Sequence, residues 1–358
     1  MKPFDRENQS LPNRRPTIDD VAALSGVARV TVSRVLNGGP NVRPQVREKV
    51  MAAVEALQYR VNVQAQRLAA RSSWTLAMVV EASHDAEPNS FYHSGLEIGA
   101  LRACADAGFQ LQMHPFSEQT EGAADAEILA LATSGQADGL VLTPPFSDRL
   151  ALLRQLHAAH FPVACISAGP EARQAAPSVR MDEAGAGFDI TRHLLEQGHR
   201  RFAFMKGLHG HLAAEERYSG FLAALAAEGL DESSVVAARG DFTFRSGAAL
   251  TPELIQAPLR PTALICANDD MAVGAMFAAH RMGLDIPAQL SVVGFDDTPV
   301  SAIIWPPLTT VHQPLKRMGA RAVELLVSQV RKTQERGERH EEIIPHQLMR
   351  RDSTAAVH

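Results

Sequence analysis

Residues 17–59 have the sequence TIDDVAALSGVARVTVSRVLNGGPNVRPQVREKVMAAVEALQY. Thr17 and Asp20 form a capping pair that predicts a helix, and Gly26 is suited to end it. The apolar spacing of residues 28–36 predicts a second short helix directly after this turn. Two short helices joined by a tight turn are typical of a helix-turn-helix, whose second helix enters the major groove of DNA.

A third helix is predicted to complete this small domain, because Pro44 is suited to a first helical turn. Its apolar stripe is expected to consist of Val46, Val50, Val54 and Leu57. On the second helix the residues expected to face inward are Val32, Val35 and Leu36. These positions predict a small three-helix domain.

The pattern of the chain changes at residue 74. Residues 62–70 can form a short helix, and residues 71–73 form a polar linker. From residue 74 helical stretches separate the strand-like segments LAMVVEA (76–82), DGLVLTPP (138–145), FPVACISAG (161–169), RFAFMKG (201–207), TALICAND (262–269) and LSVVGFDD (290–297). This alternation predicts parallel sheets covered by helices on both faces. Six or more such units exceed one sheet, so we expect two lobes with a ligand cleft between them, at the carboxyl ends of the strands.

The bulk composition favours one small domain plus a larger two-lobed unit. The chain has 358 residues, of which 46% are hydrophobic, so it is apolar enough to fold throughout. Its net charge of -5 is uneven: residues 1–74 hold twelve Lys and Arg against six Asp and Glu, which leaves 23 against 34 in the remainder. A basic head on an acidic body favours a nucleic-acid-binding module, although an ordinary solvated surface can have the same pattern.

The remaining composition bears on location and chemistry. No apolar stretch approaches the roughly 20 residues that span a bilayer, and MKPFDRENQSLPNRRP lacks a signal core, so a cytoplasmic protein is expected. The cysteines, which are expected to be buried reduced thiols, are Cys104, Cys165 and Cys266. His209 and His211 lack a third ligand nearby, so neither a metal site nor a cofactor is expected. No G-x-S-x-G, P-loop or H-E-x-x-H motif favours an enzyme.

Several segments together resemble the lactose-repressor (LacI/GalR) family. They are the 17–59 segment with its TVSRVLN helix, ANDDMAVGAM (267–276), LSVVGFDDTP (290–299) and PPLTTVHQP (306–314), in the family's order. The similarity runs from about Thr17 to Thr354. It implies an α/β protein with an N-terminal helix-turn-helix headpiece and a two-lobed, periplasmic-binding-protein-like core of doubly wound parallel sheets. It also implies a DNA-binding repressor of carbohydrate-utilisation genes, controlled by a small sugar-like effector.

The resemblance implies a set of DNA contacts, which are Thr17, Arg29, Val30, Thr31, Ser33, Arg34, Asn37 and Leu68. Arg29, Val30 and Arg34 would face base edges, because an arginine can bond guanine bidentately and a valine can contact a thymine methyl. Thr31, Ser33 and Asn37 would lie near the backbone or the groove wall. The alternative is that both arginines only solvate a helix face.

Leu68 matches the family's hinge-helix leucine, which is wedged into the minor groove at the centre of the operator. Such a wedge unstacks a base step and kinks the duplex. A helix of about nine residues is marginal in water, so the hinge is expected to fold only on DNA. The sequence departs from the family here, with Val61 in place of a proline and Gln66 in place of an arginine. The alternative is that Leu68 packs on the core.

The resemblance also implies an effector-binding set, which is Phe91, Tyr92, Ser167, Arg217, Phe242, Asn268 and Asp296. Phe91 and Tyr92 are expected in a loop after the first strand, and Ser167 stands where some sugar-binding members have an aspartate. Planar Arg, Asp and Asn groups can pair with vicinal hydroxyls, and aromatic rings can cover a sugar face. The set suits a neutral polyol better than an anion. The alternatives are helix capping by Asn268 and Asp296, and a surface ion pair for Arg217.

The expected organisation is a disordered tail (1–16), a helix-turn-helix domain (17–61), a hinge helix and linker (62–73) and a core (74–358) with an N-lobe of about 74–180 and 312–342 and a C-lobe of about 181–311 and 343–358. The implied partners are pseudo-palindromic double-stranded DNA, a small sugar and a second copy of the chain in a homodimer.

The end of the chain, RRDSTAAVH, lacks a leucine-heptad tail for a tetramer. Two other hypotheses are a sugar receptor without DNA function and an enzyme of sugar metabolism. The sequence leaves open whether the ligand lowers or raises the affinity for DNA.

Overall fold

The computed structural model describes residues 16–36, 42–59, 73–81, 90–117, 122–331 and 340–357. The chain divides into two compact units, Met1–Ser72 and Ser73–His358. Each unit has its own hydrophobic core, and each is described separately below.

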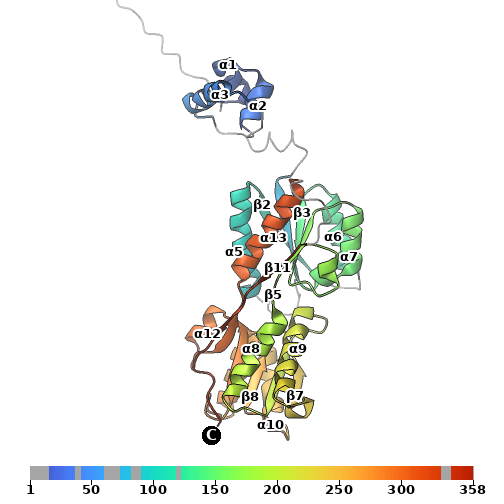
Figure 1. Ribbon diagram of the computed structural model, residues 1–358, viewed down its shortest axis with the longest axis vertical. Coiled ribbons are helices and arrows are strands. Elements are labelled where there is room, and N and C mark those ends of the chain that lie inside the picture. Colours follow the sequence, from blue (N-terminus) through green and yellow to red (C-terminus); the bar gives the residue numbers. More distant parts are fainter. Residues whose placement is uncertain are drawn as a thin grey trace, which may run out of the picture. The chain divides into compact units, whose positions relative to one another are not determined.

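The described residues of the first unit form three helices, which are α1 (Ile18–Ser25), α2 (Arg29–Leu36) and α3 (Pro44–Ala56) (Figure 1). The expected capping pair of α1 is confirmed, because Thr17 and Asp20 form a reciprocal capping box, and Gly26 ends the helix with φ +66°. The core consists of Val21, Val32, Val35, Val50, Ala53 and Tyr59. Val46, which was expected in this core, is only half-buried and is not among those residues. Ala53 and Tyr59 were not anticipated by the stripe on α3.

Within the described part of the second unit the strands form two six-stranded sheets (Figure 1). The sheet of the N-lobe has the strand order β11-β5-β4-β3-β1-β2. Its strands are β1 (Thr75–Glu81), β2 (Gln110–Phe116), β3 (Gly139–Leu142), β4 (Val163–Ile166), β5 (Ser178–Met181) and β11 (Glu341–Ile344). All neighbouring strands in this sheet are parallel.

The sheet of the C-lobe has the order β12-β10-β9-β8-β6-β7. Its strands are β6 (Phe202–Lys206), β7 (Val235–Arg239), β8 (Ala263–Cys266), β9 (Ser291–Asp296), β10 (Thr309–His312) and β12 (Gln347–Met349). The pairing is parallel except between β10 and β12. The expectation of doubly wound parallel sheets is therefore confirmed, with one antiparallel edge strand in the C-lobe.

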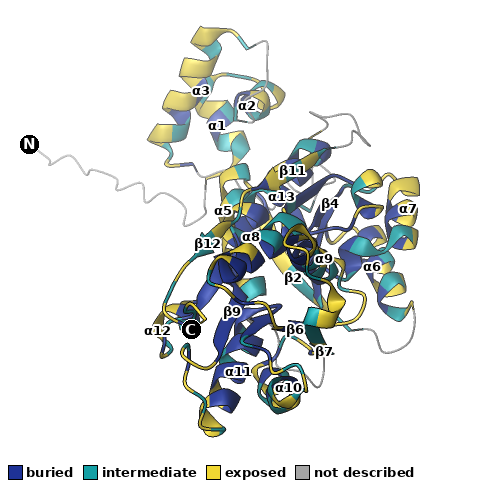
Figure 2. Cartoon of the chain, turned by 60° about the horizontal axis from the view of Figure 1, so that its bottom comes forward, coloured by how far each residue is buried: buried dark blue, intermediate teal, exposed yellow. Residues whose placement is uncertain are grey.

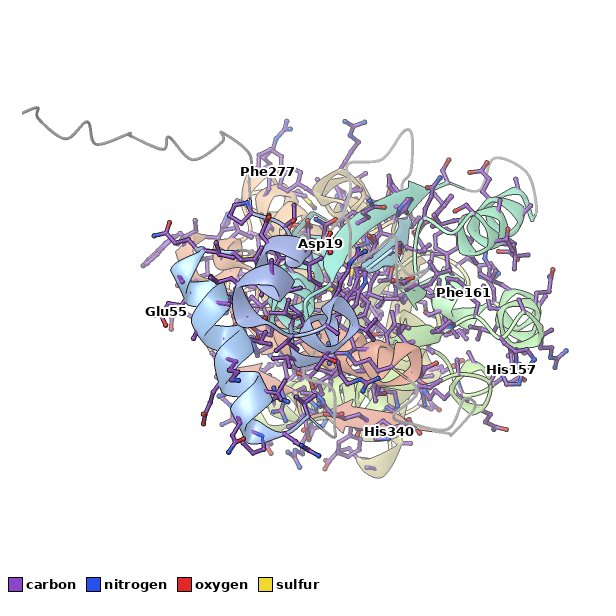
Figure 3. All side chains as sticks on the ribbon, turned by 90° about the horizontal axis from the view of Figure 1, so that it is seen from above. Asp19, Glu55, His157, Phe161, Phe277 and His340 are labelled. Carbon is purple, nitrogen blue, oxygen red and sulfur yellow. The ribbon has the colours of Figure 1, made fainter. Side chains whose placement is uncertain are left out.

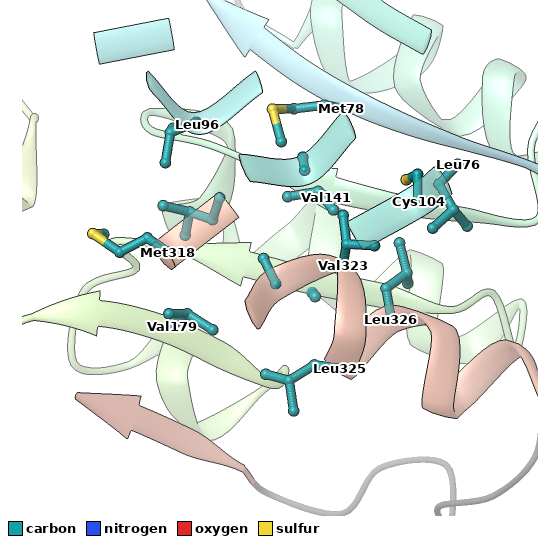
Figure 4. Close-up of a cluster of buried hydrophobic side chains, with 14 of the residues drawn as sticks. Leu76, Met78, Leu96, Cys104, Val141, Val179, Met318, Val323, Leu325 and Leu326 are labelled. Carbon is teal, nitrogen blue, oxygen red and sulfur yellow. The ribbon is translucent and has the colours of Figure 1, made fainter. Parts of the chain in front are cut away.

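Helices cover both faces of each sheet, as Figure 2 shows by the dark blue strands between them. The helices of the N-lobe are α5 (Ser90–Ala107), α6 (Ala123–Thr133), α7 (Leu150–Ala158) and α13 (Leu315–Val330). The helices of the C-lobe are α8 (Glu183–Glu196), α9 (Leu212–Ala227), α10 (Phe244–Gln256), α11 (Asp269–Arg281) and α12 (Pro299–Ile303). Alternate side chains of β1 divide between the two faces. Leu76 and Met78 pack in the cluster that contains α13 (Figure 4), and Ala77 and Val79 lie in the opposite cluster.

Pairs of glycines allow three helix pairs to cross at close range. An added Cβ on Gly187 of α8 would collide with Arg217 O of α9, and one on Gly220 of α9 would collide with Ala184 O of α8. The same reciprocal arrangement joins α5 to α13 through Gly99 and Gly319, and α10 to α11 through Gly247 and Gly274. Backbones can approach this closely only where no side chain intervenes. These crossings therefore set the positions of the helix N-termini around the strand ends.

All three cysteines are buried and free, which confirms that expectation. None of the helices within the described ranges is long and apolar enough to cross a membrane.

We predict that Gly220→Ala destabilises the core. In an open helix this change stabilises a protein by roughly 0.5–1 kcal/mol, so a loss must come from crowding. The added methyl group pushes α9 away from Ala184 O, and overpacking of this kind typically costs about 1–3 kcal/mol. Chemical unfolding of the full chain measures the effect. Ser219→Ala, on the exposed side of the same helix, is the matched control, and a variant as stable as the wild type would contradict the crossing.

Candidate DNA-binding and ligand-binding sites

The second helix of the first unit divides cleanly into a buried and an exposed side. Val32 and Val35 are buried, and Arg29, Val30 and Arg34 are exposed. Val30 has 71% of its surface exposed, although an apolar β-branched side chain gains nothing from water. An exposed valine between two arginines can contact a thymine methyl beside bonded guanines. The exposed side of α2 therefore presents side chains whose chemistry is suited to base edges.

The other residues of the DNA-binding set have different surroundings. Thr31 and Ser33 are half-buried on α2, and the Thr17 hydroxyl belongs to the capping box of α1. Arg29 Nε lies 3.3 Å from Asp19 Oδ1, and both side chains are largely exposed, so this pair is weak. Asn37 and Leu68 lie outside the described residues, as do Val61 and Gln66. The hinge mechanism therefore stays a prediction.

Arg217 of α9 is the centre of the second site, and burial excludes the alternative of a surface ion pair, because only 4% of it is exposed. Its Nε donates to Glu183 Oε2 at 2.7 Å, and its Nη1 donates to Ala267 O at 2.7 Å. Its guanidinium carbon lies 4.8 Å from the centre of the Phe295 ring. Glu183 and the neighbouring Asp296 raise the pKa of Arg217, although burial opposes them.

Asp296, at the end of β9, is the second buried ionisable group of this site. Its Oδ1 accepts a 2.6 Å hydrogen bond from Gln313 Nε2, and its backbone has φ +114°. Burial raises the pKa of Asp296 well above its usual range, and Asp269 and Asp270 add to this effect, while Arg217 opposes it. Asp296 does not cap a helix, since Thr298 occupies the N-cap of α12.

Tyr92 of the N-lobe interacts electrostatically with this group. Burial raises the pKa of the Tyr92 phenol, the Ser167 hydroxyl beside it lowers that pKa, and the charges of Glu183, Arg217 and Asp296 also act on it. Tyr92 and Ser167 therefore lie next to the C-lobe charges. The expectation of a loop for Phe91 and Tyr92 is wrong, because both lie in the first turn of α5. Phe91, like Tyr92, packs against the N-lobe core.

Phe242 and Asn268 form a second cluster in the C-lobe. Asn268 caps α11 by accepting from Met271 N at 3.0 Å, as the alternative reading had it, and its Nδ2 donates to Phe242 O at 2.9 Å. The ring of Phe242 covers Gly207, where an added Cβ would collide with it. The ring of His211 meets Phe242 at a centroid distance of 5.0 Å, nearly edge-on.

His211 has a defined protonation state. Its Nδ1 accepts from Ala214 N at 3.3 Å and caps α9, so in the neutral ring Nε2 carries the proton. Burial lowers the pKa of His211 to about 4, and Arg217 contributes to this shift. His211 therefore offers an N–H donor beside an aromatic ring, which is a contact suited to a sugar.

Glu183, Gln313 and His211 were missed as ligand-site residues in the sequence. Glu183 begins α8 directly after β5, and Gln313 lies between β10 and α13. Both residues lie where the chain crosses from one lobe to the other. Glu183 could have been found from its place after a strand. The four residues SVRM of β5 alternate between polar and apolar, but this run is too short to reveal the strand from the sequence.

Two further contacts join the lobes beside this site. Arg173, in the short 3-10 helix Ala172–Gln174 of the N-lobe, donates from Nη2 to Glu216 Oε1 of α9. Gly169 lies against Leu212, where an added Cβ would collide with the leucine side chain. Arg173 also donates from Nε to Ala168 O, which holds it in place at 2.6 Å.

Comparisons with known proteins match both units. Residues 17–62 match the model of bacterial regulatory proteins of the lacI family, and residues 191–354 match a periplasmic binding protein-like domain. The chain is 35% identical over 326 residues to the HTH-type transcriptional regulator CelR of Thermobifida fusca, which covers 88% of this chain and 92% of that protein. It is 30% identical over 321 residues to catabolite control protein A of Priestia megaterium, covering 88% and 93%.

Solved structures agree with these relatives. A lac repressor dimer bound to operator and the anti-inducer ONPF superposes with a TM-score of 0.75 at 27% identity, covering 96% of this chain and 100% of that one. A CelR–cellobiose complex superposes with a TM-score of 0.70 at 31% identity, covering 95% and 100%. The headpiece, the two-lobed core and the relatives lead to the same conclusion: the chain belongs to the lacI family of bacterial regulatory proteins and is a DNA-binding transcriptional regulator rather than an enzyme.

Proposed function

We propose that the chain represses carbohydrate-utilisation genes as a cytoplasmic homodimer whose affinity for a pseudo-palindromic operator is controlled by a small neutral sugar. The observation that supports the proposal most strongly is the buried Arg217, which has Glu183 and Asp296 as its acidic partners. The same chain has an exposed surface formed by Arg29, Val30 and Arg34. The division into a tail (1–16), headpiece (17–61), hinge (62–73) and core (74–358) is part of this proposal.

The DNA-binding part rests on the exposed side of α2. Arg29, Val30 and Arg34 are assigned to base edges, with Thr31, Ser33 and Asn37 near the groove wall and Leu68 at the operator centre. Support comes from the exposure of Val30 and from the relative solved on its operator. Each half-site is read by one headpiece, so a two-fold dimer requires a pseudo-palindrome.

The ligand-binding part rests on groups from both lobes. Arg217, Asp296 and Asn268 are assigned to sugar hydroxyls, and Phe242 with His211 to an apolar sugar face. Tyr92 and Ser167 complete the site from the N-lobe, with Phe91 behind them. Support comes from the electrostatic coupling of Tyr92 to Glu183, Arg217 and Asp296, and from the relative solved with cellobiose.

The dimer is supported by large apolar side chains on the surface of the C-lobe. Phe277 of α11 is 46% exposed (Figure 3), and Ile303 and Trp305 are each 81% exposed. Phe244 of α10 packs against Phe277 with ring centroids 5.5 Å apart. Exposed apolar side chains in this number are typical of a surface that a partner covers, and the relative solved with operator is a dimer.

We predict that Arg34→Ala abolishes sequence-specific DNA binding and leaves sugar binding intact. Loss of a bidentate guanine contact costs roughly 1–3 kcal/mol per half-site, and a dimer loses it twice. Fluorescence anisotropy on an operator selected from random duplexes measures the loss. Lys49→Ala, which removes the same charge from the exposed face of α3, is the control. An operator affinity equal to that of the wild type would contradict this assignment.

We predict that Asp296→Asn lowers sugar affinity at least ten-fold while the chain becomes more stable at neutral pH. Because burial raises the pKa of Asp296, the unfolded chain releases this proton at a lower pH than the folded chain. The wild type therefore loses stability relative to the variant as the pH rises from about 4. Calorimetric titration and unfolding across pH 4–8 measure both effects. The exposed Asp285→Asn is the control, and unchanged sugar affinity or a less stable Asp296→Asn chain would contradict the prediction.

A further inference from the structure

Three buried oxygens around Arg217 have no hydrogen-bond partner among the described residues. They are Glu183 Oε1, Asp296 Oδ2 and Gln313 Oε1. Each of these residues is at most 3% exposed. An unpaired buried polar atom costs about 1–3 kcal/mol, so three of them close together need a compensating partner. The oxygens of the Glu183 carboxylate and the Gln313 amide are acceptors, whereas the Asp296 carboxyl accepts when ionised and can donate when protonated. A ligand group that both donates and accepts, such as a hydroxyl, can therefore compensate all three oxygens.

We propose that Glu183 determines the ligand class of this site: it restricts the ligand to neutral, hydroxyl-rich sugars and excludes sugar acids and sugar phosphates. This inference rests on the proposed sugar-binding function and adds the residue that selects among sugars. Glu183 Oε1 accepts from a ligand hydroxyl, while Oε2 holds Arg217.

The position of Glu183 suits both tasks. It is the first residue of α8, and the glycine crossing with α9 brings it to 2.7 Å from Arg217 Nε. The two bonds of the guanidinium, to Glu183 Oε2 and Ala267 O, engage Nε and Nη1 but not Nη2. One face of the site therefore presents an arginine N–H beside a carboxylate oxygen, which is the pattern that a hydroxyl group satisfies as acceptor and donor together.

The charge balance excludes an anion. One guanidinium is the partner of two carboxyl groups: it bonds Glu183 and interacts electrostatically with Asp296, whose pKa is already raised by burial. Lys206 at the end of β6 and Arg239 at the end of β7 already have other partners. Lys206 Nζ lies 3.5 Å from the centre of the Tyr218 ring, and Arg239 Nη1 pairs with Glu215 at 2.8 Å. A ligand carboxylate or phosphate would add a buried negative charge without a new counter-ion, which is strongly unfavourable.

Matched sugars test this inference on the full-length chain. Calorimetric titration compares D-glucose, D-galactose and cellobiose with D-glucuronate, D-galacturonate and D-glucose 6-phosphate. In the wild type at least one neutral sugar binds, and its acidic counterpart binds at least 100-fold more weakly. Glu183→Gln turns one acceptor into an amide donor. It should lower the affinity for the neutral sugar about ten-fold and narrow the preference over the acid at least ten-fold.

The control is Glu228→Gln, which removes the same charge from the exposed C-terminal end of α9 and should leave both affinities unchanged. A melting curve shows whether the Glu183→Gln chain is folded. If it is not folded, the affinities of the wild type for neutral and acidic sugars test the inference without the variant. An acid that binds as tightly as its neutral counterpart overturns the inference and leaves the sugar-controlled regulator standing. A folded Glu183→Gln chain with wild-type selectivity overturns the role of Glu183. If no neutral sugar binds, the inference falls together with the sugar part of the proposed function.

Discussion

The proposed ligand site of this regulator depends on one buried guanidinium. A charge removed from water costs several kcal/mol unless it is paired and hydrogen-bonded, and Arg217 obtains its compensation from Glu183, the carbonyl of Ala267 and the ring of Phe295. These groups come from the start of α8, the residue after β8 and the end of β9. They can meet only because the glycines of α8 and α9 let those helices cross closely.

The residues that hold the charged groups also lie where the chain passes between lobes. Glu183 follows β5 of the N-lobe, and Gln313, which bonds Asp296, precedes α13 of the N-lobe. A ligand that bonds these side chains acts on the crossover segments, and Arg173 with Glu216 adds a bond between the lobes beside them. The ligand changes DNA affinity only by its difference in affinity for the two lobe arrangements. The crossover residues are where such a difference can arise.

The sequence predicted the general architecture well, because its signals are local. Each of these signals predicts one helix or strand by itself. They are the capping pair Thr17–Asp20 of α1 and the apolar runs of β1, β3, β4, β6, β8 and β9. Short strands such as β5 and β11, with SVRM and EEII, were not recognised because tertiary pairing rather than periodicity makes them strands. The sequence predicts a loop at Phe91 and Tyr92, where the structure has the start of α5. Gly95 and Gly99 weaken its helix propensity, yet both lie against α13, where a side chain would collide. Arg217 and Asp296 could be assigned from the resemblance, but Glu183, Gln313 and His211 have roles that only the folded chain creates. Whether the assigned DNA and effector residues act as assigned stays a prediction.

The central claim is that one chain couples sugar binding in the core to sequence-specific DNA binding by the headpiece. The most direct measurement is capture of sheared genomic DNA by the purified full-length protein at moderate salt, with and without a panel of neutral sugars, followed by sequencing of the bound fragments. The account predicts that a few pseudo-palindromic sites are enriched and that at least one neutral sugar changes their recovery. Uniform recovery of all fragments, or enriched sites whose recovery no neutral sugar alters, would contradict it.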